Sequence, residues 1–357
     1  MIGLPNVGKT TIFNALIGTS AVVANYPFST VGTNIGIAQV PDPRVSKLAE
    51  IFRSRKATPS TLEIRDIAGL VQGASHGEGL GNQFLGQIRE VDALLHVVRC
   101  FENPDVVHVP GDVNPLRDIE TVETELMLAD LDSLGRRRQR LEKRLKSGDT
   151  PAAKEQAFVQ RATELLNKGE WVGSQPFSPE EHVFLKEYQL LSAKPVLFIA
   201  NVTEGAVADD PYVRAVREVA DKKRAPVVVI CGQLEQELSA LPVQERDVYL
   251  HELGLIESGL VRLTAAMYAL LALITFFTAN EEEARAWAIR KGTKAVEAAG
   301  KIHSDMERGF IRAEVFAYDD LIACGTPAGV REKGHFRLEG RDYEIKEGDV
   351  VYFRFNV

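Results

Sequence analysis

Several features that would assign this chain to a specialised class are missing from its sequence. The three cysteines, Cys100, Cys231 and Cys324, are far apart, and no pair has the spacing of a metal site or a redox motif. The longest apolar stretch, 265–277, is well short of the ~20 residues that cross a bilayer. We therefore expect no disulfide, no zinc site and no membrane partner.

We also expect no secretory leader, because a glycine-rich motif begins at the third residue. The sequence therefore predicts a cytoplasmic protein. Basic residues are in deficit: the net charge of −8 argues against wholesale wrapping of nucleic acid and against sequence-specific DNA binding. A local basic patch stays open.

Length and apolar content predict more than one domain. With 357 residues, of which 45% are hydrophobic, the chain exceeds the usual size of a single core and has enough apolar residues for two or three. Short apolar runs at 92–98, 194–200 and 225–231 are typical of buried parallel strands. They predict an α/β nucleotide-binding domain, formed by 1–113 and 193–276, with a parallel sheet and helices on both faces.

The segment between these two halves, 114–192, has no convincing strand, and its apolar residues recur at helical spacing. We expect it to form an inserted helical hairpin. Its middle part is strongly basic, with Arg136, Arg137, Arg138, Arg140, Lys143, Arg144 and Lys146. Such a run is either a solvated helix face or an arm that contacts RNA phosphates.

The pattern changes again near residue 277, where the apolar stretch 265–277 is interpreted as a core helix that runs into a strand. The remainder, 277–357, is expected to be a small α+β domain. Its predicted helix lies near 294–307, and its predicted strands are 284–289, 310–316, 343–345 and 350–355.

The most informative motif is GLPNVGKT at 3–10, which has the G-x-x-x-x-G-K-[ST] pattern of a phosphate-binding loop before a helix. Its glycines let backbone N–H groups surround the phosphates. Lys9 is expected to span the β and γ phosphates, and the Thr10 hydroxyl to ligate Mg²⁺. The predicted nucleotide-binding residues here are Asn6, Val7, Gly8, Lys9, Thr10 and Thr11. Only two residues precede the loop, so the first strand of this fold is either very short or truncated.

A second motif, DIAG at 66–69, follows the strand-like residues 62–64. Asp66 is expected to hold Mg²⁺ through water, and the Gly69 N–H to meet the γ-phosphate. Leu70 occupies the place where Ras-like GTPases carry a water-orienting glutamine, so another group must manage the nucleophilic water.

Two further segments are predicted to sense the γ-phosphate. The glycine-rich segment 73–81 is interpreted as a mobile switch, and Thr30, within 28–31, is a candidate Mg²⁺ ligand. The alternatives are a merely flexible loop and an ordinary loop threonine.

The N-K-x-D motif with which GTPases read guanine is replaced by NVTE at 201–204. Glu204 is one methylene longer than the aspartate, and the flanking lysine is absent, so the bidentate contact with guanine should weaken. The sequence therefore predicts the use of ATP. The predicted nucleotide-binding residues in this part of the chain are Asn201, Val202, Glu204, Cys231 and Gly232.

These motifs, with GASHGEGLGNQFL at 73–85, HVVRCFEN at 96–103 and AGKIHSD at 299–305, strongly resemble the YchF or Obg-like ATPase family over nearly the whole chain. The resemblance implies that 277–357 is a ubiquitin-like β-grasp (TGS) domain. It implies a preference for ATP over GTP and binding to the ribosome, particularly RNA and protein of its large subunit. The chain departs from the family at Thr33, where relatives commonly have proline.

The resemblance also implies roles for single residues. His108 would replace the missing glutamine in hydrolysis; the other predicted catalytic residue, Lys9, is assigned from the phosphate-binding motif itself. Phe101 would pack on the adenine, and Asn6 would help to coordinate K⁺. From the residues alone, a histidine before a Val-Pro-Gly turn is more often structural, so the catalytic role of His108 rests on the resemblance.

Three functions stay open at this point. The first is an ATP-driven switch on ribosomes, in which the γ-phosphate orders the switch segments. The second is a binding module whose nucleotide is a ligand and is not consumed, which is consistent with Leu70. The third is a conventional GTPase in which Glu204 shifts to do the work of the aspartate.

Overall fold

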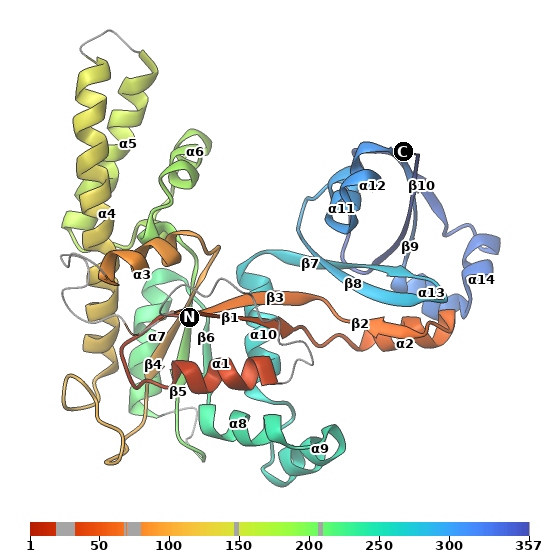
Figure 1. The fold of residues 1–357 in the computed structure, drawn as a ribbon, viewed down its shortest axis with the longest axis horizontal. Coiled ribbons are helices and arrows are strands. Elements are labelled where there is room, and N and C mark those ends of the chain that lie inside the picture. Colours follow the sequence, from red (N-terminus) through yellow and green to blue (C-terminus); the bar gives the residue numbers. More distant parts are fainter. Residues whose placement is uncertain (19–32, 68, 70–79, 146–149, 206–209, 357) are drawn as a thin grey trace. The chain divides into compact units, whose positions relative to one another are not determined.

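A computed structural model of the chain describes residues 1–18, 33–67, 69, 80–145, 150–205 and 210–356 (Figure 1). The chain divides into two compact units. Unit 1 comprises Met1–Gly36 and Ile64–Ala266, and unit 2 comprises Ile37–Glu63 and Met267–Val357. The chain passes between them within the paired strands β1 (Thr33–Gln39) and β3 (Thr61–Ile67), and within helix α10 (Gly259–Leu270).

The core of unit 1 is a parallel sheet with the order β4 (Leu94–Arg99), β5 (Val196–Asn201) and β6 (Val227–Ile230). Every residue of β4 and β5 is buried, as expected for apolar strands covered on both faces. The accompanying helices are α1 (Lys9–Gly18), α3 (Leu80–Arg89), α7 (Pro211–Lys223), α8 (Gly232–Ala240) and α9 (Val243–Glu252). The predicted α/β fold class is confirmed.

The first two residues lie where this fold normally has its first strand. The Ile2 N–H donates to Leu95 O at 2.8 Å, and Ile2 O accepts from the Val97 N–H at 2.9 Å. Met1 O accepts from the Ile67 N–H of β3 at 3.3 Å, so this short segment hydrogen-bonds to both β3 and β4. A two-residue bridge therefore takes the place of the expected strand.

His96 of β4 is the residue that pairs with Ile2 in this bridge, and its side chain is buried. We therefore predict that acid destabilises the core of unit 1. Burial lowers the pKa of His96 to about 3, and the charges of Lys9 and Lys223 act in the same direction. The unfolded chain has the ordinary histidine pKa of about 6.5, so between pH 6.5 and 3 the unfolded state binds more protons. The stabilising effect of the neutral ring is thus present above pH 6.5 and is lost as the pH falls towards 3.

We expect His96→Phe to remove this contribution, because phenylalanine can keep the ring contact with Phe198, whose centroid is 5.4 Å away. Urea unfolding at pH 7, 6 and 5 measures the effect. The wild type should lose up to about 1.4 kcal/mol per pH unit relative to the variant. Parallel pH dependences of the two proteins would contradict this.

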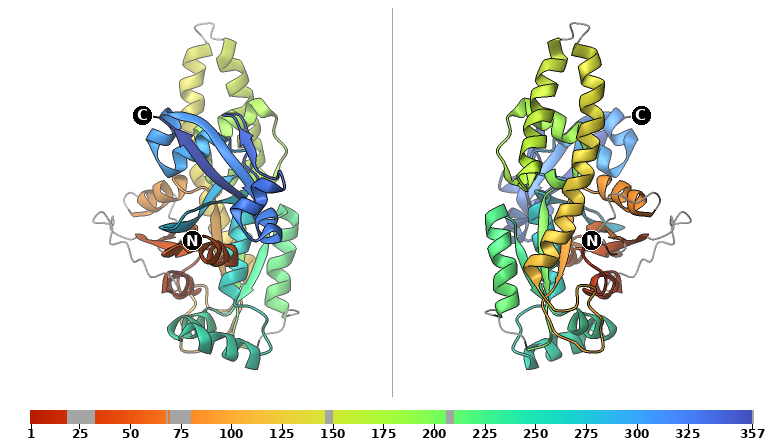
Figure 2. Two further views of the ribbon diagram at one scale, coloured as in Figure 1. Left: turned by 90° about the vertical axis from the view of Figure 1, so that its right-hand side faces the viewer. Right: turned by 90° about the vertical axis from the view of Figure 1, so that its left-hand side faces the viewer.

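The insertion between β4 and β5 is helical, as predicted. Helices α4 (Pro115–Leu145) and α5 (Thr150–Asn167) lie side by side in both Figure 1 and Figure 2. The chain returns through η1 (Val172–Ser174), α6 (Pro179–Tyr188) and η2 (Leu191–Ala193). At the base of the hairpin the buried carboxylate of Asp130 accepts from the backbone N–H groups of Leu191 and Ser192 at 2.9 and 2.8 Å. This fixes the end of the insertion to α4.

Unit 2 has a six-stranded sheet with the order β10, β9, β11, β7, β8 and β2. Its central strands β11 and β7 are parallel, and antiparallel pairs flank them, which is the β-grasp arrangement. The strands are β2 (Lys56–Thr58), β7 (Leu273–Ala279), β8 (Glu283–Arg290), β9 (Phe310–Ala317), β10 (Arg337–Glu339) and β11 (Asp349–Phe355). The helices are α2 (Pro43–Phe52), α11 (Ala295–Ile302), α12 (Ser304–Arg308), α13 (Tyr318–Cys324) and α14 (Pro327–Glu332).

Each face of this sheet has its own hydrophobic core, because neighbouring residues of a strand point to opposite faces. Phe277 and Val350 belong to the core with α2, α13 and α14, whereas Phe276 and Val351 belong to the core with α11. The last stretch of the chain is therefore held between two layers of helices.

Four expectations from the sequence differ from the structure. The predicted helix 294–307 is broken at His303, whose extended backbone separates α11 from α12. The predicted strand 343–345 is reduced to one bridge between Lys294 and Glu344. Residues 80–81, placed in a glycine-rich loop, begin α3. Residues 37–63 and 267–276, expected in the nucleotide-binding domain, belong to unit 2, where β2 and β7 both pair with β8.

Across the parts of the chain that the structure describes, no helix combines the length and the apolar character needed to span a membrane.

Candidate nucleotide-binding site

The loop 3–10 connects the Ile2 bridge to α1, and its backbone is shaped for close approach. Asn6 and Gly8 have φ angles of 61° and 94°, in the left-handed region. A Cβ atom added to Gly8 would lie 2.2 Å from Asn201 Nδ2, so only glycine fits there without displacing that side chain. The loop leads directly into the first turn of α1, whose free N–H groups favour an anion.

Lys9 is the first residue of α1, and its side chain turns back over the loop. Its Nζ donates to Gly3 O at 3.1 Å and to Leu4 O at 2.6 Å. Burial lowers the pKa of Lys9 to about 8, and the charge of Asp66 opposes this shift. The ammonium is thus positioned at the loop and only 7% exposed.

Thr10 and Asp66 meet beside this loop. Thr10 Oγ1 donates to Asp66 Oδ2 at 2.9 Å, and Asp66 Oδ1 is buried with no hydrogen-bond partner among the described residues. A hydroxyl and a carboxylate are hard oxygen donors of the kind that Mg²⁺ takes together with phosphate oxygens. These two residues fit the metal, although no cluster of three His, Cys, Asp or Glu side chains occurs in the described residues.

Gly69 lies against the same loop, since an added Cβ would be 2.7 Å from Pro5 N. The other predicted γ-phosphate contacts, Thr30 and most of the segment 73–81, lie outside the described residues, as does Leu70.

Asn201, at the end of β5, connects three parts of the site. Its Nδ2 donates to Val7 O at 2.9 Å, and its Oδ1 accepts from the Gly232 N–H at 2.9 Å. The amide therefore ties the phosphate-binding loop to the start of α8. Each of its two polar atoms makes one hydrogen bond to a backbone group.

Most of the predicted residues line one cavity of about 470 Å³. Its predicted lining residues are Asn6, Gly8, Lys9, Thr10, Thr11, Phe101, Asn201, Val202 and Cys231. The sequence did not indicate the others, which are Asn103, Val106, Thr203, Gln233 and Gln236. Val7, Asp66, Gly69, Gly232 and Glu204 do not line it; Glu204 is an exposed turn residue.

Arg99, which the sequence reasoning did not select, shapes the part of the cavity formed by the loop after β4. Its guanidinium donates to Phe101 O at 3.1 Å, Val106 O at 3.0 Å and Asn103 O at 3.2 Å. It also lies 4.6 Å from the centroid of the Phe101 ring. One signal was present: a charged residue inside an apolar strand needs a buried partner.

We expect Arg99→Met to loosen this loop, because three backbone acceptors lose their donors at once. The free energy of unfolding should fall by about 3 kcal/mol, and ATP affinity by at least about tenfold. Urea unfolding and nucleotide titration measure the two effects. Arg65→Met is a matched control. Arg65 forms an ion pair with Glu90 at 2.7 Å, and the side chain of Glu90 is solvent-exposed. Unchanged ATP affinity in Arg99→Met would show that the loop does not depend on the guanidinium.

His108 does not line the cavity in this structure. Its Nε2 lies 2.8 Å from Asp118 Oδ2, and its Nδ1 is buried without a hydrogen-bond partner in the described part of the chain. The residue before it is connected to the phosphate-binding loop, because Asn6 Nδ2 donates to Val107 O at 3.0 Å. The backbone is thus at the site while the side chain faces Asp118.

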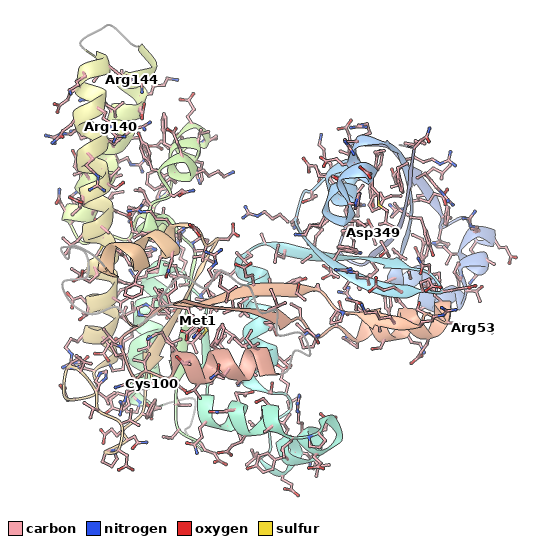
Figure 3. All side chains as sticks on the ribbon, viewed as in Figure 1. Met1, Arg53, Cys100, Arg140, Arg144 and Asp349 are labelled. Carbon is pink, nitrogen blue, oxygen red and sulfur yellow. The ribbon has the colours of Figure 1, made fainter. Side chains whose placement is uncertain are left out.

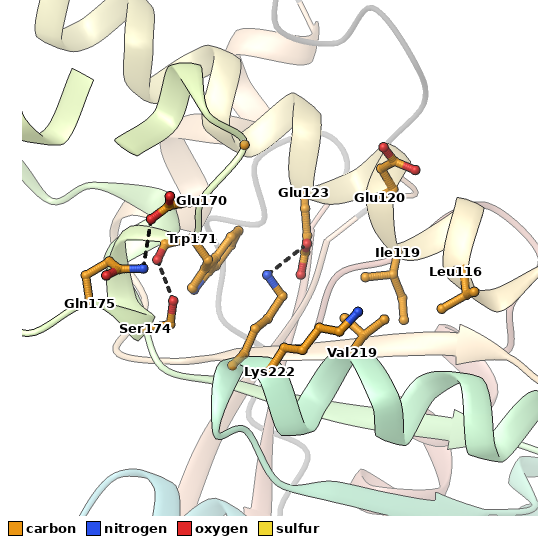
Figure 4. A pocket seen from close by; sticks show the side chains of 12 residues that line it. Leu116, Ile119, Glu120, Glu123, Glu170, Trp171, Ser174, Gln175, Val219 and Lys222 are labelled. Carbon is orange, nitrogen blue, oxygen red and sulfur yellow. Dashed lines mark hydrogen bonds and ion pairs between the residues drawn. The ribbon is translucent and has the colours of Figure 1, made fainter. Parts of the chain in front are cut away.

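A second cavity of unit 1, of about 480 Å³, lies between α4, α7 and the segment 169–175 (Figure 4). Lys223 pairs with Glu123 at 3.1 Å across it, and the Lys223 ammonium lies 5.0 Å from the ring centroid of Trp171. It contains none of the predicted site residues. The predicted nucleotide-binding residues therefore gather at the cavity beside the phosphate-binding loop.

A glycine loop at the start of α1, with a lysine and a threonine–aspartate pair beside it, defines a P-loop nucleotide-binding protein. Consistently, residues 1–133 match the family described as 50S ribosome-binding GTPase. Two curated relatives named "Ribosome-binding ATPase YchF", from Pasteurella multocida and Bacillus subtilis, are 50% and 48% identical over 357 and 360 residues. Each match covers 100% of this chain and 98% of the relative. The chain belongs to the YchF family.

The C-terminal part and the fold agree with this membership. Residues 273–356 match the YchF-GTPase C-terminal family, described as a protein of unknown function (DUF933). The structure of the Schizosaccharomyces pombe YchF GTPase is similar with a TM-score of 0.86 and 32% identity. That similarity covers 99% of this chain and 96% of the other.

Proposed function

We propose that this chain is a ribosome-binding ATPase that hydrolyses ATP to ADP and phosphate and acts as a molecular switch in translation or stress. One observation carries the proposal: Lys9, Thr10 and Asn201 line one cavity, with Asp66 hydrogen-bonded to Thr10, in a chain whose relatives, similar over their whole length, are named ribosome-binding ATPases. GTP is the poorer substrate in this proposal.

The proposed chemistry starts from the residues around the loop. Lys9 neutralises charge on the β and γ phosphates once it exchanges its two carbonyl partners for phosphate oxygens. Thr10 and, through water, Asp66 would hold Mg²⁺, and the Gly69 N–H would contact the γ-phosphate. When bound, Mg²⁺ supplies electrostatic stabilisation of the transferred phosphoryl group. Asn6 contributes to a K⁺ site beside the phosphates, and Thr30 and 73–81 respond to the γ-phosphate.

His108 is proposed to orient or activate the attacking water in place of the missing glutamine. Its ring must leave Asp118 to do so, because in this structure it faces that carboxylate and is absent from the lining of the cavity. The loop is connected to the phosphate-binding loop through Asn6 and Val107, which supports a coupling between bound phosphate and this side chain.

The preference for ATP is proposed from the residues that surround the base position. Asn201 uses both polar atoms of its amide to hold backbone groups, and Glu204 lies outside the cavity. Phe101 would pack on the adenine, and Cys231, which precedes Gly232, lines the same cavity. A site without a correctly aligned carboxylate has no bidentate contact for guanine.

Competition binding tests the choice of nucleotide. ATP should displace a fluorescent ATP analogue from the purified chain at a clearly lower concentration than GTP. Displacement by GTP at equal or lower concentration would instead favour the conventional GTPase, with Glu204 moved into the site. A chain that binds ATP but releases no phosphate, with or without ribosomes, would favour the nucleotide-regulated binding module.

The proposed partner is the large ribosomal subunit, through its RNA and protein, and the proposed location is the cytoplasm. Support comes from relatives named for binding ribosomes and from the matching family described as 50S ribosome-binding GTPase.

A further inference from the structure

An arginine cluster in unit 2 surrounds Glu314 of β9. Nε and Nη2 of Arg354 donate to the two carboxylate oxygens of Glu314 at 2.9 and 3.0 Å. Arg331 and Arg312 approach the same carboxylate only to 3.6 and 3.7 Å, too far for good hydrogen bonds. Glu314 is 6% exposed, whereas the arginine side chains are 51–59% exposed.

The sheet register places these side chains on one face. Arg354 of β11 is directly opposite Arg312 of β9, and Tyr352 is opposite Glu314. On the other side of β9, Leu338 of β10 is also opposite Glu314. Arg331 reaches the cluster from α14. Three neighbouring strands and one helix thus present a continuous polar surface with an apolar edge.

The charges in this cluster do not balance. One carboxylate faces three guanidiniums, and two of these lie directly opposite each other, where like charges destabilise a sheet. The hydrogen bonds from Arg354 lower the pKa of Glu314, so the carboxylate stays ionised and still leaves an excess of two positive charges. An anion with several oxygens would give the guanidiniums of Arg312 and Arg331 close hydrogen-bond partners, which none of the described residues supplies.

The basic arm of unit 1 is a weaker candidate for the same role. Figure 3 shows Arg140 and Arg144 near the free end of α4. Four arginines of this helix already have carboxylate partners: Arg136 pairs with Asp132, Arg138 with Glu142, and Arg137 and Arg144 with Glu155. Unit 2 contains as many Lys and Arg as Asp and Glu residues, so the net charge of −8 belongs to unit 1. A polyanion meets less repulsion at unit 2.

We propose that Arg312, Arg331 and Arg354 form a binding site for the phosphate backbone of RNA. The inference rests on the proposed function for the identity of that RNA, which is then ribosomal RNA. Arg354 holds Glu314 in place, and Arg312 and Arg331 bind phosphate oxygens.

The surroundings favour RNA over an acidic protein segment. The Arg331 guanidinium lies 3.9 Å from the ring centroid of Phe336, and Leu338 is 62% exposed beside the cluster. With the partly buried Tyr352 they form an apolar and aromatic edge next to the guanidiniums. Bases and riboses use such edges for stacking while their phosphates bind arginine.

The test uses the full-length chain with Arg312→Gln and Arg331→Gln combined, which leaves the Arg354–Glu314 pair intact. Arg308→Gln combined with Arg341→Gln is the matched control, because these are also exposed arginines of unit 2 and the change in net charge is the same. Binding to protein-free ribosomal RNA and co-sedimentation with intact ribosomes are measured between 50 and 200 mM salt. A variant with lysine at both positions tests whether charge alone suffices.

The cluster variant should bind ribosomal RNA and ribosomes at least about tenfold more weakly than the wild type. The salt dependence of log K should become shallower by about one for each lost phosphate contact. The control should bind like the wild type, and ATP hydrolysis without ribosomes should be unchanged in both. The lysine variant should recover much of the affinity.

Other outcomes separate this inference from the proposed function. Undiminished binding of the cluster variant to both probes overturns the inference alone. Weaker binding to ribosomes with unchanged binding to free RNA assigns the cluster to a ribosomal protein and also overturns it. Binding of the wild type to free RNA but not to ribosomes, with loss in the variant, sustains the inference and contradicts the proposed function. Binding to neither probe contradicts both.

Discussion

Lys9→Met should abolish most nucleotide chemistry, with kcat/KM for ATP reduced by at least about 100-fold. The variant has a side chain of similar length but lacks the ammonium that lies over the phosphate-binding loop. Charge-assisted hydrogen bonds to phosphate are lost in both the bound and the transition state, so ATP affinity should fall as well. Nucleotide titration and single-turnover phosphate release measure the two losses.

Lys194→Met is a control that the structure itself provides. Lys194 also sits in a partly buried place and donates to two backbone carbonyls, Arg89 O at 2.9 Å and Val91 O at 2.5 Å. The two variants should therefore lose similar amounts of stability. Only Lys9→Met should lose ATP binding; an equal loss in both would mean that the effect is one of folding.

His108→Ala should lower the rate of phosphate release by about 100-fold or more while ATP affinity is retained. The reason is that the proposed role of His108 concerns the attacking water and not the bound nucleotide. The measurement is single-turnover hydrolysis at saturating ATP, with ATP binding determined separately by titration.

The pair between His108 and Asp118 also stabilises the fold, so a structural effect must be separated from a catalytic one. Asp118→Asn removes the carboxylate that the His108 ring contacts but keeps the histidine, and it should retain most of the rate. His182→Ala, on an exposed histidine of α6, should behave like the wild type. An unchanged rate in His108→Ala, or an equal loss in Asp118→Asn, would remove His108 from the mechanism.

The sequence predicted those parts of the site that depend on local motifs. The loop 3–10 and Asp66 could be assigned because backbone geometry and ligand chemistry restrict which residues can stand at those positions. The parallel strands β4 and β5 could be predicted because strands buried on both faces must be continuously apolar. The β-grasp domain was expected from resemblance, and its strands β8, β9 and β11 followed from their apolar patterns.

Contacts that depend on the folded path of the chain could not be predicted in this way, even where a buried charge such as Arg99 indicated that a partner was needed. Arg99 organises its loop through backbone carbonyls, which carry no signature of side-chain type. The three residues of β2 are too few for a pattern, and their partner β8 is more than 200 residues away in the sequence. The orientation of His108 towards Asp118 depends on the packing of α4, so it could not be inferred from the spacing of residues in the sequence.

The most direct test of the whole account is steady-state phosphate release by the purified chain from ATP and from GTP, with Mg²⁺ and K⁺, in the presence and absence of ribosomes. The account predicts faster release from ATP than from GTP and a further increase when ribosomes are added. A preference for GTP with no response to ribosomes would contradict the account and would favour a conventional GTPase instead.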